Sequence, residues 1–349
     1  MLCLYVTIHH ISLQSMASKT VSRIPIIDLS PFTSFASLSS RKLAAKDLAS
    51  TLHLNGSVGI TGHGFPASML QEIFDIAKKL FDLPYEDKMR APHPSGPTPH
   101  RGYSGPGKEM TGRKTALETN DVSKTEEILR AADYKESYEI GSSENKTQYN
   151  ILLPEDVFPG FREKTTRLFW ELNKTAKAVL DALIMSLGLR EEEAAHIRSL
   201  HTGHDDQLRL LHYPPIPVGA LKGKDTSRLG AHTDWSLFTL LFQDVVGRLE
   251  FLDREIGDYV PATPQEGVVY MNVGDMFQRL SNGIYPSAMH RVVIAGNDGE
   301  QTTPARYSIP YFVSPIGEGI IEPQKSLIER NGKQVYESVT FNTYSEAMF

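Results

Sequence analysis

The second half of the chain is a series of short β-rich runs separated by turns, and this pattern constrains the fold most strongly. The runs lie at 207–213, 237–243, 248–252, 268–273, 290–295 and 306–313. Many short strands at this spacing predict a β-sandwich or barrel. A double-sheet jelly roll is a common way to protect the edges of such strands, so we expect a double-stranded β-helix in this half.

The first half mixes strands with helices. Apolar residues recur at helical spacing over 68–88, and Ser68 is a candidate N-cap. The strongest helical stripe runs over 161–189, with Gly188 where a helix should stop. The other elements that we expect here are a strand at 23–32, a helix at 41–54 and a strand with its turn at 56–65. The fold class is therefore α+β, with a jelly-roll core flanked by helices and an N-terminal domain of helices and strands.

Composition narrows the class of partner. The 349 residues can form one large domain or two intimate ones, and the net charge of −6 disfavours nucleic acid and anionic membranes. No apolar run approaches the roughly 18 residues that a membrane span needs. The single cysteine, Cys3, excludes an intramolecular disulfide and fits a reducing compartment, so we expect a cytoplasmic protein. We expect residues 1–22 to be a disordered leader, with Met16 as an alternative start to Met1.

A histidine and an aspartate stand two residues apart at the start of an apolar run, "HTDWSLFTLLF". On a strand, His232 and Asp234 project to the same side while Thr233 points away. His290, at the start of another apolar run, can supply a third ligand. Two imidazoles and one carboxylate form the facial triad of non-haem Fe(II) sites. A catalytic zinc could use the same ligands, so the triad alone does not name the metal.

Arg306 and Ser308 lie on one face of the last predicted strand, in "ARYSIPYFV". Burying a guanidinium and a hydroxyl on an apolar strand is costly unless an anion binds there. The planar guanidinium matches a carboxylate in a bidentate manner. A keto diacid could bind Arg306 at one end and the iron at the other, which points to 2-oxoglutarate.

Several motifs in order resemble the Fe(II)/2-oxoglutarate-dependent dioxygenases of the isopenicillin N synthase-like family. The resemblance extends from Ile24 to about Pro315. In the first half it rests on "IPIIDLSPF", "GITGHGF", "FDLPYEDK" and "KESYEIG", and in the second on "LRLLHYPPIP", "HTDWSLFTLLFQD", "NVGDMFQRLSNGIYPSAMHRV" and "RYS". It implies an N-terminal domain over 23–200, a catalytic jelly roll over 201–320 and a tail over 321–349 that closes the pocket.

The resemblance also implies roles for single residues. The family's HxD…H iron site falls on His232, Asp234 and His290, its RxS motif falls on Arg306 and Ser308, and its tyrosine before a double proline falls on Tyr213. The implied reaction consumes O2 and 2-oxoglutarate, releases succinate and CO2, and oxidises a substrate C–H bond, with ascorbate as an aid to activity. Hydroxylation is the simplest outcome, while desaturation and ring chemistry stay open.

Two other functions remain open at this point. One is an oxidase of the same fold that needs no 2-oxoglutarate, in which Arg306, Ser308 and Tyr213 bind the substrate's own carboxylate. The other is a catalytically silent protein that has kept the fold and binds a small molecule.

The resemblance further places the substrate pocket beside the loop over 99–110. We expect Tyr103, Trp235, Phe238 and Phe312 to line it. This aromatic lining would suit a small hydrophobic metabolite of secondary metabolism, such as a polyketide, terpenoid or alkaloid. The sequence does not indicate an oligomeric state.

The remaining polar candidates have simpler interpretations. We expect His63 and His212 to be structural, and "HTGHDD" at 201–206 to be a solvated loop although it competes as a metal site. Asn272 and Asp275 are expected to fix a turn. Lys108, Arg113 and Lys114 are expected to form the solvated face of a loop.

Overall fold

The computed structural model describes residues 24–34, 36–95, 100–108, 133–217, 228–294 and 302–347. The expected leader, including Met16 and Cys3, lies outside the described residues, as do Arg113 and Lys114. Lys108 is described and is exposed, as expected for the face of a loop. None of the described helices is long and apolar enough to cross a membrane.

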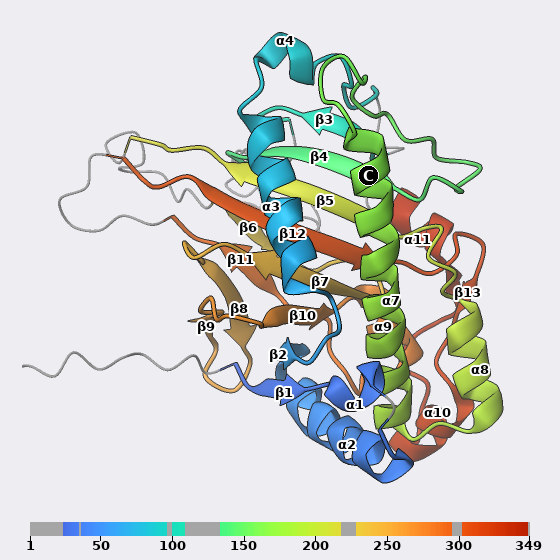
Figure 1. Ribbon diagram of the computed structural model, residues 1–349. Coiled ribbons are helices and arrows are strands. Elements are labelled where there is room, and N and C mark those ends of the chain that lie inside the picture. The colour runs from blue at the N-terminus through green and yellow to red at the C-terminus, as the bar shows by residue number, and fades with distance from the viewer. Residues whose placement is uncertain are drawn as a thin grey trace, which may run out of the picture.

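An eight-stranded sheet and a four-stranded sheet form the framework (Figure 1). The large sheet has the order β1-β2-β10-β7-β12-β5-β4-β3, and the small one has the order β6-β11-β8-β9. The strands of the large sheet are β1 (Ile26–Asp28), β2 (Ser57–Thr61), β3 (Gly102–Ser104), β4 (Glu136–Gly141), β5 (Gln207–Tyr213), β7 (Phe238–Gln243), β10 (Val269–Val273) and β12 (Arg306–Val313). Those of the small sheet are β6 (Leu229–His232), β8 (Leu249–Asp253), β9 (Asp258–Pro261) and β11 (His290–Val292), while β13 (Ile320–Ile321) pairs with β14 (Val339–Thr340).

Helices cover one face of the large sheet, where α3 and α7 run across its strands, and α2 lies at the end near β1 (Figure 1). The helices are α1 (Ser30–Thr33), α2 (Leu38–Asn55), α3 (Ala67–Phe81), α4 (Tyr85–Lys88), α7 (Phe161–Leu187), α8 (Glu191–Ser199), α9 (Asp275–Leu280), α10 (Lys325–Asn331) and α11 (Phe341–Glu346). The α+β jelly-roll architecture expected from the sequence is therefore present.

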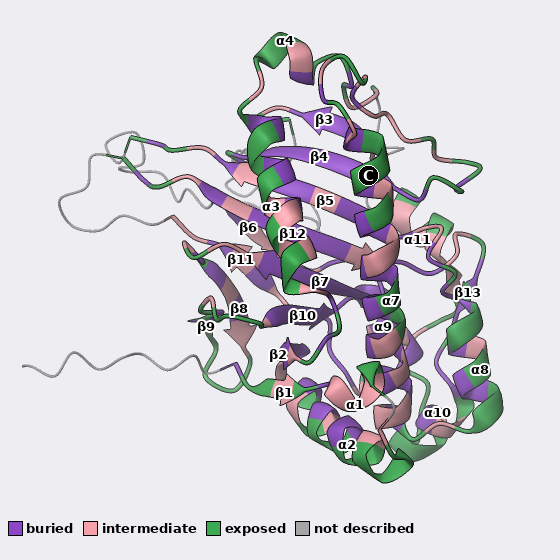
Figure 2. Cartoon of the chain, in the orientation of Figure 1, coloured by how far each residue is buried: buried purple, intermediate pink, exposed green. Residues whose placement is uncertain are grey.

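The two faces of the large sheet pack against different layers. We call the face that carries Arg306 and Ser308 the inner face, and the opposite face the outer face. Outer-face residues such as Tyr311 and Leu240 pack against α3 and α7 in the larger core cluster. Inner-face residues such as Leu211 and Leu241 pack with Phe251 and Val292 of the small sheet. Because both faces are covered, the central strands are buried almost throughout (Figure 2).

Most expected elements occur, with three corrections. The helix expected over 68–88 is broken into α3 and α4, because Pro84 disfavours helical geometry at the residue before it. The N-cap of α3 is Pro66 rather than Ser68. The strand expected over 290–295 ends at Val292. In contrast, α7 ends before Gly188, which adopts a left-handed φ of 60° as expected.

The N-terminal segment shares its sheet with the second half of the chain. Strands β1 and β2 flank β10 on one side of the large sheet, and β4 and β3 flank β5 on the other. Among the strand pairs of the described residues, β1–β2 alone is parallel. Consequently, residues from 23–200 and from 201–320 contribute to one continuous inner face.

Candidate active site

Two histidines and an aspartate converge between the sheets. His232 ends β6 and pairs in register with His290 at the start of β11. Asp234 follows β6 by two residues, and its Oδ1 lies 3.7 Å from Nε2 of His232 and 3.8 Å from Nε2 of His290. All three side chains are buried. The three groups expected to form a triad therefore face one another and could hold one metal ion.

The tautomers of both imidazoles are set by the backbone. Nδ1 of His232 lies 2.8 Å from the carbonyl oxygen of Gly230, and Nδ1 of His290 lies 3.0 Å from that of Ala288. A carbonyl oxygen only accepts, so each Nδ1 carries the proton and donates it. This leaves the lone pair of each Nε2 directed toward Asp234, where a metal would bind.

Asp234 is likewise held through the oxygen that faces away from the histidines. Its Oδ2 accepts hydrogen bonds from Thr239 Oγ1 at 2.6 Å and from Asn272 Nδ2 at 2.7 Å. The expectation that Asn272 fixes a turn is wrong, because it lies within β10 and its amide orients Asp234. Asp275 begins α9, and its backbone N–H donates to the carbonyl oxygen of Asp234.

Burial and neighbouring charges favour the protonation states in which His232 and Asp234 can bind a metal. Burial, reinforced by neighbouring His290, lowers the pKa of His232 to about 3. Burial opposes ionisation of Asp234, but His290, His232 and the two hydrogen bonds keep the pKa of Asp234 below its usual value. At neutral pH the site thus holds a neutral imidazole at His232 and a carboxylate at Asp234. Two nitrogen donors and one oxygen donor fit a ferrous ion with open coordination positions.

Arg306 provides a buried cation on the inner face of β12. Its Nη1 donates to Ser308 Oγ at 3.0 Å, its Nε donates to the carbonyl oxygen of Gly247, and its guanidinium lies 4.7 Å from the centre of the Tyr213 ring. Tyr213 is its register partner on β5. Within the described residues, no carboxylate lies at ion-pair distance from this guanidinium. A buried cation surrounded by neutral acceptors is a suitable site for a carboxylate ligand.

Arg228 is a second buried guanidinium near this site that the sequence reasoning missed. It donates to the carbonyl oxygen of Pro214 at 2.7 Å and to Oγ1 of Thr303. Burial lowers the pKa of Arg228, and nearby Arg306 adds to that effect. No motif marks Arg228, because only the fold brings the residue before β6 next to β12.

Comparison with known proteins places this geometry in a family. Residues 204–315 match the model of the 2OG-Fe(II) oxygenase superfamily, and residues 24–160 match that of the N-terminal region of non-haem dioxygenases in morphine synthesis. The 2-oxoglutarate-dependent dioxygenase htyE of Aspergillus rugulosus is 32% identical over 311 residues, covering 88% of this chain and 92% of htyE. The chain belongs to the 2-oxoglutarate- and Fe(II)-dependent oxygenases.

Other relatives agree with this assignment. A proline hydroxylase, buaE of Petromyces alliaceus, is 32% identical, covering 84% of this chain and 88% of buaE. The crystal structure of Neurospora crassa T7H in complex with alpha-KG, which is 2-oxoglutarate, matches with a TM-score of 0.80 and 30% identity, covering 93% of this chain and 95% of T7H. The oxygenase described here is therefore a non-haem Fe(II)/2-oxoglutarate dioxygenase.

The four aromatic residues expected to line the substrate pocket of the oxygenase divide between the two faces. Phe312 shares the inner face with Arg306, and Trp235 directly follows Asp234; both are partly exposed. Phe238 instead pairs with Val313 and is buried in the outer-face core. Tyr103 also faces outward, and its hydroxyl donates to Glu136 Oε2 at 2.6 Å. The structure thus places Tyr103 and Phe238 away from the inner face, contrary to the expectation.

The other polar residues that the sequence offered as candidate metal ligands have structural roles in the oxygenase. His201 and Asp206 are completely buried and lie 3.0 Å apart, and Asp206 also accepts from Tyr311 and from the backbone N–H of Ser314. The interpretation of 201–206 as a solvated loop is therefore wrong for these two residues. His212 contacts Glu136 at 2.7 Å, and His63 accepts from the backbone N–H of Phe65, as expected of structural histidines.

Proposed function

We propose that this oxygenase hydroxylates a C–H bond of a small metabolite, with Fe(II) bound by His232, Asp234 and His290. We further propose that 2-oxoglutarate binds to Arg306, Ser308 and Tyr213. The observation that carries this proposal is the arrangement, between the same two sheets, of three inward-facing ligand atoms and a buried guanidinium that has no carboxylate partner among the described residues. Two histidines and one carboxylate leave room for both O2 and a chelating keto acid.

The protein's own groups would bind and orient 2-oxoglutarate and the iron. Arg306 and Ser308 would hold the far carboxylate of 2-oxoglutarate, and the ring of Tyr213 would close one side of that site. Thr239 and Asn272 fix the Asp234 carboxylate, so that one oxygen remains available. When bound, iron and 2-oxoglutarate supply the oxidising chemistry, releasing succinate and CO2.

A small-molecule substrate is supported by the relatives. One structure of T7H contains thymine as well as alpha-KG and matches with a TM-score of 0.79. The single cysteine supports a reducing compartment, and we propose the cytoplasm. An oxidase that needs no 2-oxoglutarate fits less well, because the T7H complexes contain alpha-KG and htyE is a 2-oxoglutarate-dependent dioxygenase.

The proposal is tested by the products. Protein reconstituted with Fe(II) is supplied with O2 and 2-oxoglutarate, and succinate is measured with and without candidate metabolites. We expect a slow basal rate of succinate formation, a faster rate with a substrate, and neither in Asp234→Ala. Turnover of a substrate without added 2-oxoglutarate would instead support the same-fold oxidase, and a complete lack of O2 consumption would support a silent binding protein.

A further inference from the structure

A second group of polar side chains lies on the inner face, next to the iron site but separate from it. It consists of Arg101, Glu139, Gln207 and Arg209, which we call the inner-face polar cluster. Glu139 is completely buried and Arg101 is 2% exposed. Burying a guanidinium and a carboxylate costs free energy, so the burial of Arg101 and Glu139 on the inner face calls for an explanation.

Strand register places the cluster around one aromatic ring. Phe312 on β12 pairs with Gln207 on β5, and Gln207 pairs with Gly141 on β4. The guanidinium of Arg101 covers Gly141 so closely that a Cβ there would lie 2.0 Å from Arg101 Nη2. Arg209 lies above the Phe312 ring, 5.3 Å from its centre. Gln207 and Arg209 thus lie beside the partly exposed Phe312 ring, and Arg101 lies over the neighbouring position on β4.

The cluster is connected to the iron ligands through one residue. Phe312 also pairs in register with Thr239 on β7, whose hydroxyl donates to Asp234. Side chains directly opposite each other on antiparallel strands have Cβ atoms about 5 Å apart. A small molecule resting on Phe312 would therefore lie close to the metal position.

Two donors of the cluster have no acceptor within the part of the chain that the structure describes. Arg101 Nε and Gln207 Nε2 are buried and form no hydrogen bond with any described residue. The charges, by contrast, are nearly balanced: Arg209 pairs with Glu139 at 2.9 Å, and Arg101 lies within electrostatic reach of Glu139 and Asp205. Donors without acceptors in a balanced environment favour a neutral ligand with a carbonyl oxygen.

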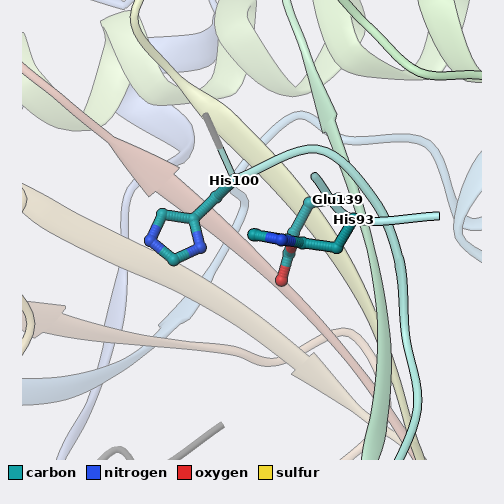
Figure 3. Close-up of side chains that lie close together, drawn as sticks. All are labelled: His93, His100 and Glu139. Atoms are coloured by element: carbon teal, nitrogen blue, oxygen red, sulfur yellow. The ribbon is translucent and has the colours of Figure 1, made fainter. Parts of the chain in front are cut away.

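A second metal site is the competing interpretation. His93, His100 and Glu139 lie close enough together to share an ion (Figure 3). However, Glu139 is already paired with Arg209, and Arg101 adds a second guanidinium nearby. A divalent cation placed there would be repelled by two fixed positive charges. The cluster is therefore better suited to an uncharged organic group than to a metal.

We propose that the inner-face polar cluster recognises the substrate through a planar, uncharged amide or imide group, which stacks on Phe312 and accepts hydrogen bonds from Arg101 and Gln207. This inference rests on the proposed function, because it names the substrate class of the same active site. It replaces the expected hydrophobic metabolite with one that carries a polar, carbonyl-bearing head group.

The first test compares matched probes. Basal succinate formation by the Fe(II)-loaded wild-type protein is measured with benzamide, phenylacetamide and thymine, and with benzoate and phenylacetate as the matched acids. We expect at least one amide or imide to accelerate succinate formation and the acids to do so at least about tenfold less effectively. Stronger acceleration by the acids, or no acceleration by any amide or imide, would overturn the inference. Absence of basal succinate formation would contradict the proposed function itself.

The second test removes a donor without disturbing the fold. Gln207→Met keeps the side-chain volume and deletes a buried donor that has no acceptor, so thermal stability should be unchanged or higher. The half-saturating concentration of the active amide should rise about tenfold, while that of 2-oxoglutarate should change much less. Arg101→Gln should behave similarly toward the amide, and Gln71→Met on the surface of α3 is the matched control. An unchanged amide response in both cluster variants would overturn the inference. Stoichiometric binding of a second Co(II) ion that is lost in His93→Ala would overturn it in favour of a metal site.

Discussion

Each proposed iron ligand is held by a hydrogen bond on the side away from the metal position. The two imidazoles donate to backbone carbonyls, and Asp234 accepts from Thr239 and Asn272. These contacts fix the ring tautomers and the orientation of the carboxylate before any ion binds. Such outer contacts commonly change metal affinity or activity by about 10- to 100-fold.

Replacing Asn272 therefore tests whether these hydrogen bonds position the proposed iron ligands. In Asn272→Ala, Asp234 keeps its hydrogen bond from Thr239 but loses the second one. We expect the Fe(II) concentration at half-maximal activity to rise about 10- to 100-fold, with a smaller effect on the half-saturating 2-oxoglutarate concentration. If Fe(II) dependence were unchanged in the folded variant, Asn272 would not position the ligand.

Arg306 is expected to act on the cosubstrate alone. Arg306→Ala should raise the half-saturating 2-oxoglutarate concentration about 100-fold, since a charge-assisted, bidentate pair contributes about 2–3 kcal/mol. His232→Ala and Asp234→Ala should instead abolish turnover, because each removes a proposed ligand. Unchanged 2-oxoglutarate dependence in Arg306→Ala would contradict the assignment of the anion site.

At the scale of elements, β4 presents acidic residues to both faces of the large sheet. Glu139 faces inward, whereas Glu136 faces the helices and accepts from Lys88 at 2.9 Å, from Tyr103 at 2.6 Å and from His212. Burial opposes ionisation of Glu136, but the hydrogen bonds from His212, Tyr103 and Lys88 outweigh it and lower the pKa of Glu136. This outer network links α4 to strands β3, β4 and β5 of the large sheet.

The network predicts a pH-dependent loss of stability. Because the folded-state pKa of Glu136 is lowered, its contribution is fully present above the unfolded pKa of about 4.3 and is lost as pH falls through the folded value. Glu136→Gln should lower the free energy of unfolding by about 3 kcal/mol at pH 7, and the difference from wild type should narrow below about pH 4. Urea denaturation at pH 7 and below about pH 4 measures this free-energy difference. Glu86→Gln, at an exposed position of α4, is the control. A pH-independent difference would contradict the account.

The same two-faced packing explains what the sequence could and could not predict. Strand periodicity correctly placed Arg306 and Ser308 on one face, and the motif order identified the family. Periodicity does not say which face is the inner one, and here both faces are apolar because helices cover the outer face. The family resemblance placed Phe238 and Tyr103 in the pocket, and periodicity could not correct this expectation, although both side chains face outward. Glu139 and Arg209 escaped notice because only β-sheet register brings them together.

At the scale of the whole molecule, the active site lies between the two sheets, so its ligands contact both layers. His232 and His290 belong to the small sheet, whereas Arg306 and Ser308 belong to the large one. Iron and 2-oxoglutarate bound together would link the sheets and stabilise only the folded state. A ligand at 100 times its dissociation constant stabilises the folded state by about 2.7 kcal/mol.

Thermal unfolding can detect this coupling between sheets. Co(II), as an unreactive substitute for Fe(II), together with 2-oxoglutarate should raise the Tm by several degrees, and EDTA should reverse the change. The increase should be larger than the sum of the two separate ligand effects, because the keto acid also binds the metal. Asp234→Ala should show no metal-dependent increase. A Tm insensitive to both ligands in the wild type would argue against a shared site.

The most direct measurement is an anaerobic titration of the protein with Fe(II) and then with 2-oxoglutarate. We expect one equivalent of each to bind, with tight 2-oxoglutarate binding only after iron is present. We also expect loss of iron binding in Asp234→Ala and weakened 2-oxoglutarate binding, with intact iron binding, in Arg306→Ala. Iron binding that survives in Asp234→Ala, or equal 2-oxoglutarate binding with and without iron, would contradict these expectations.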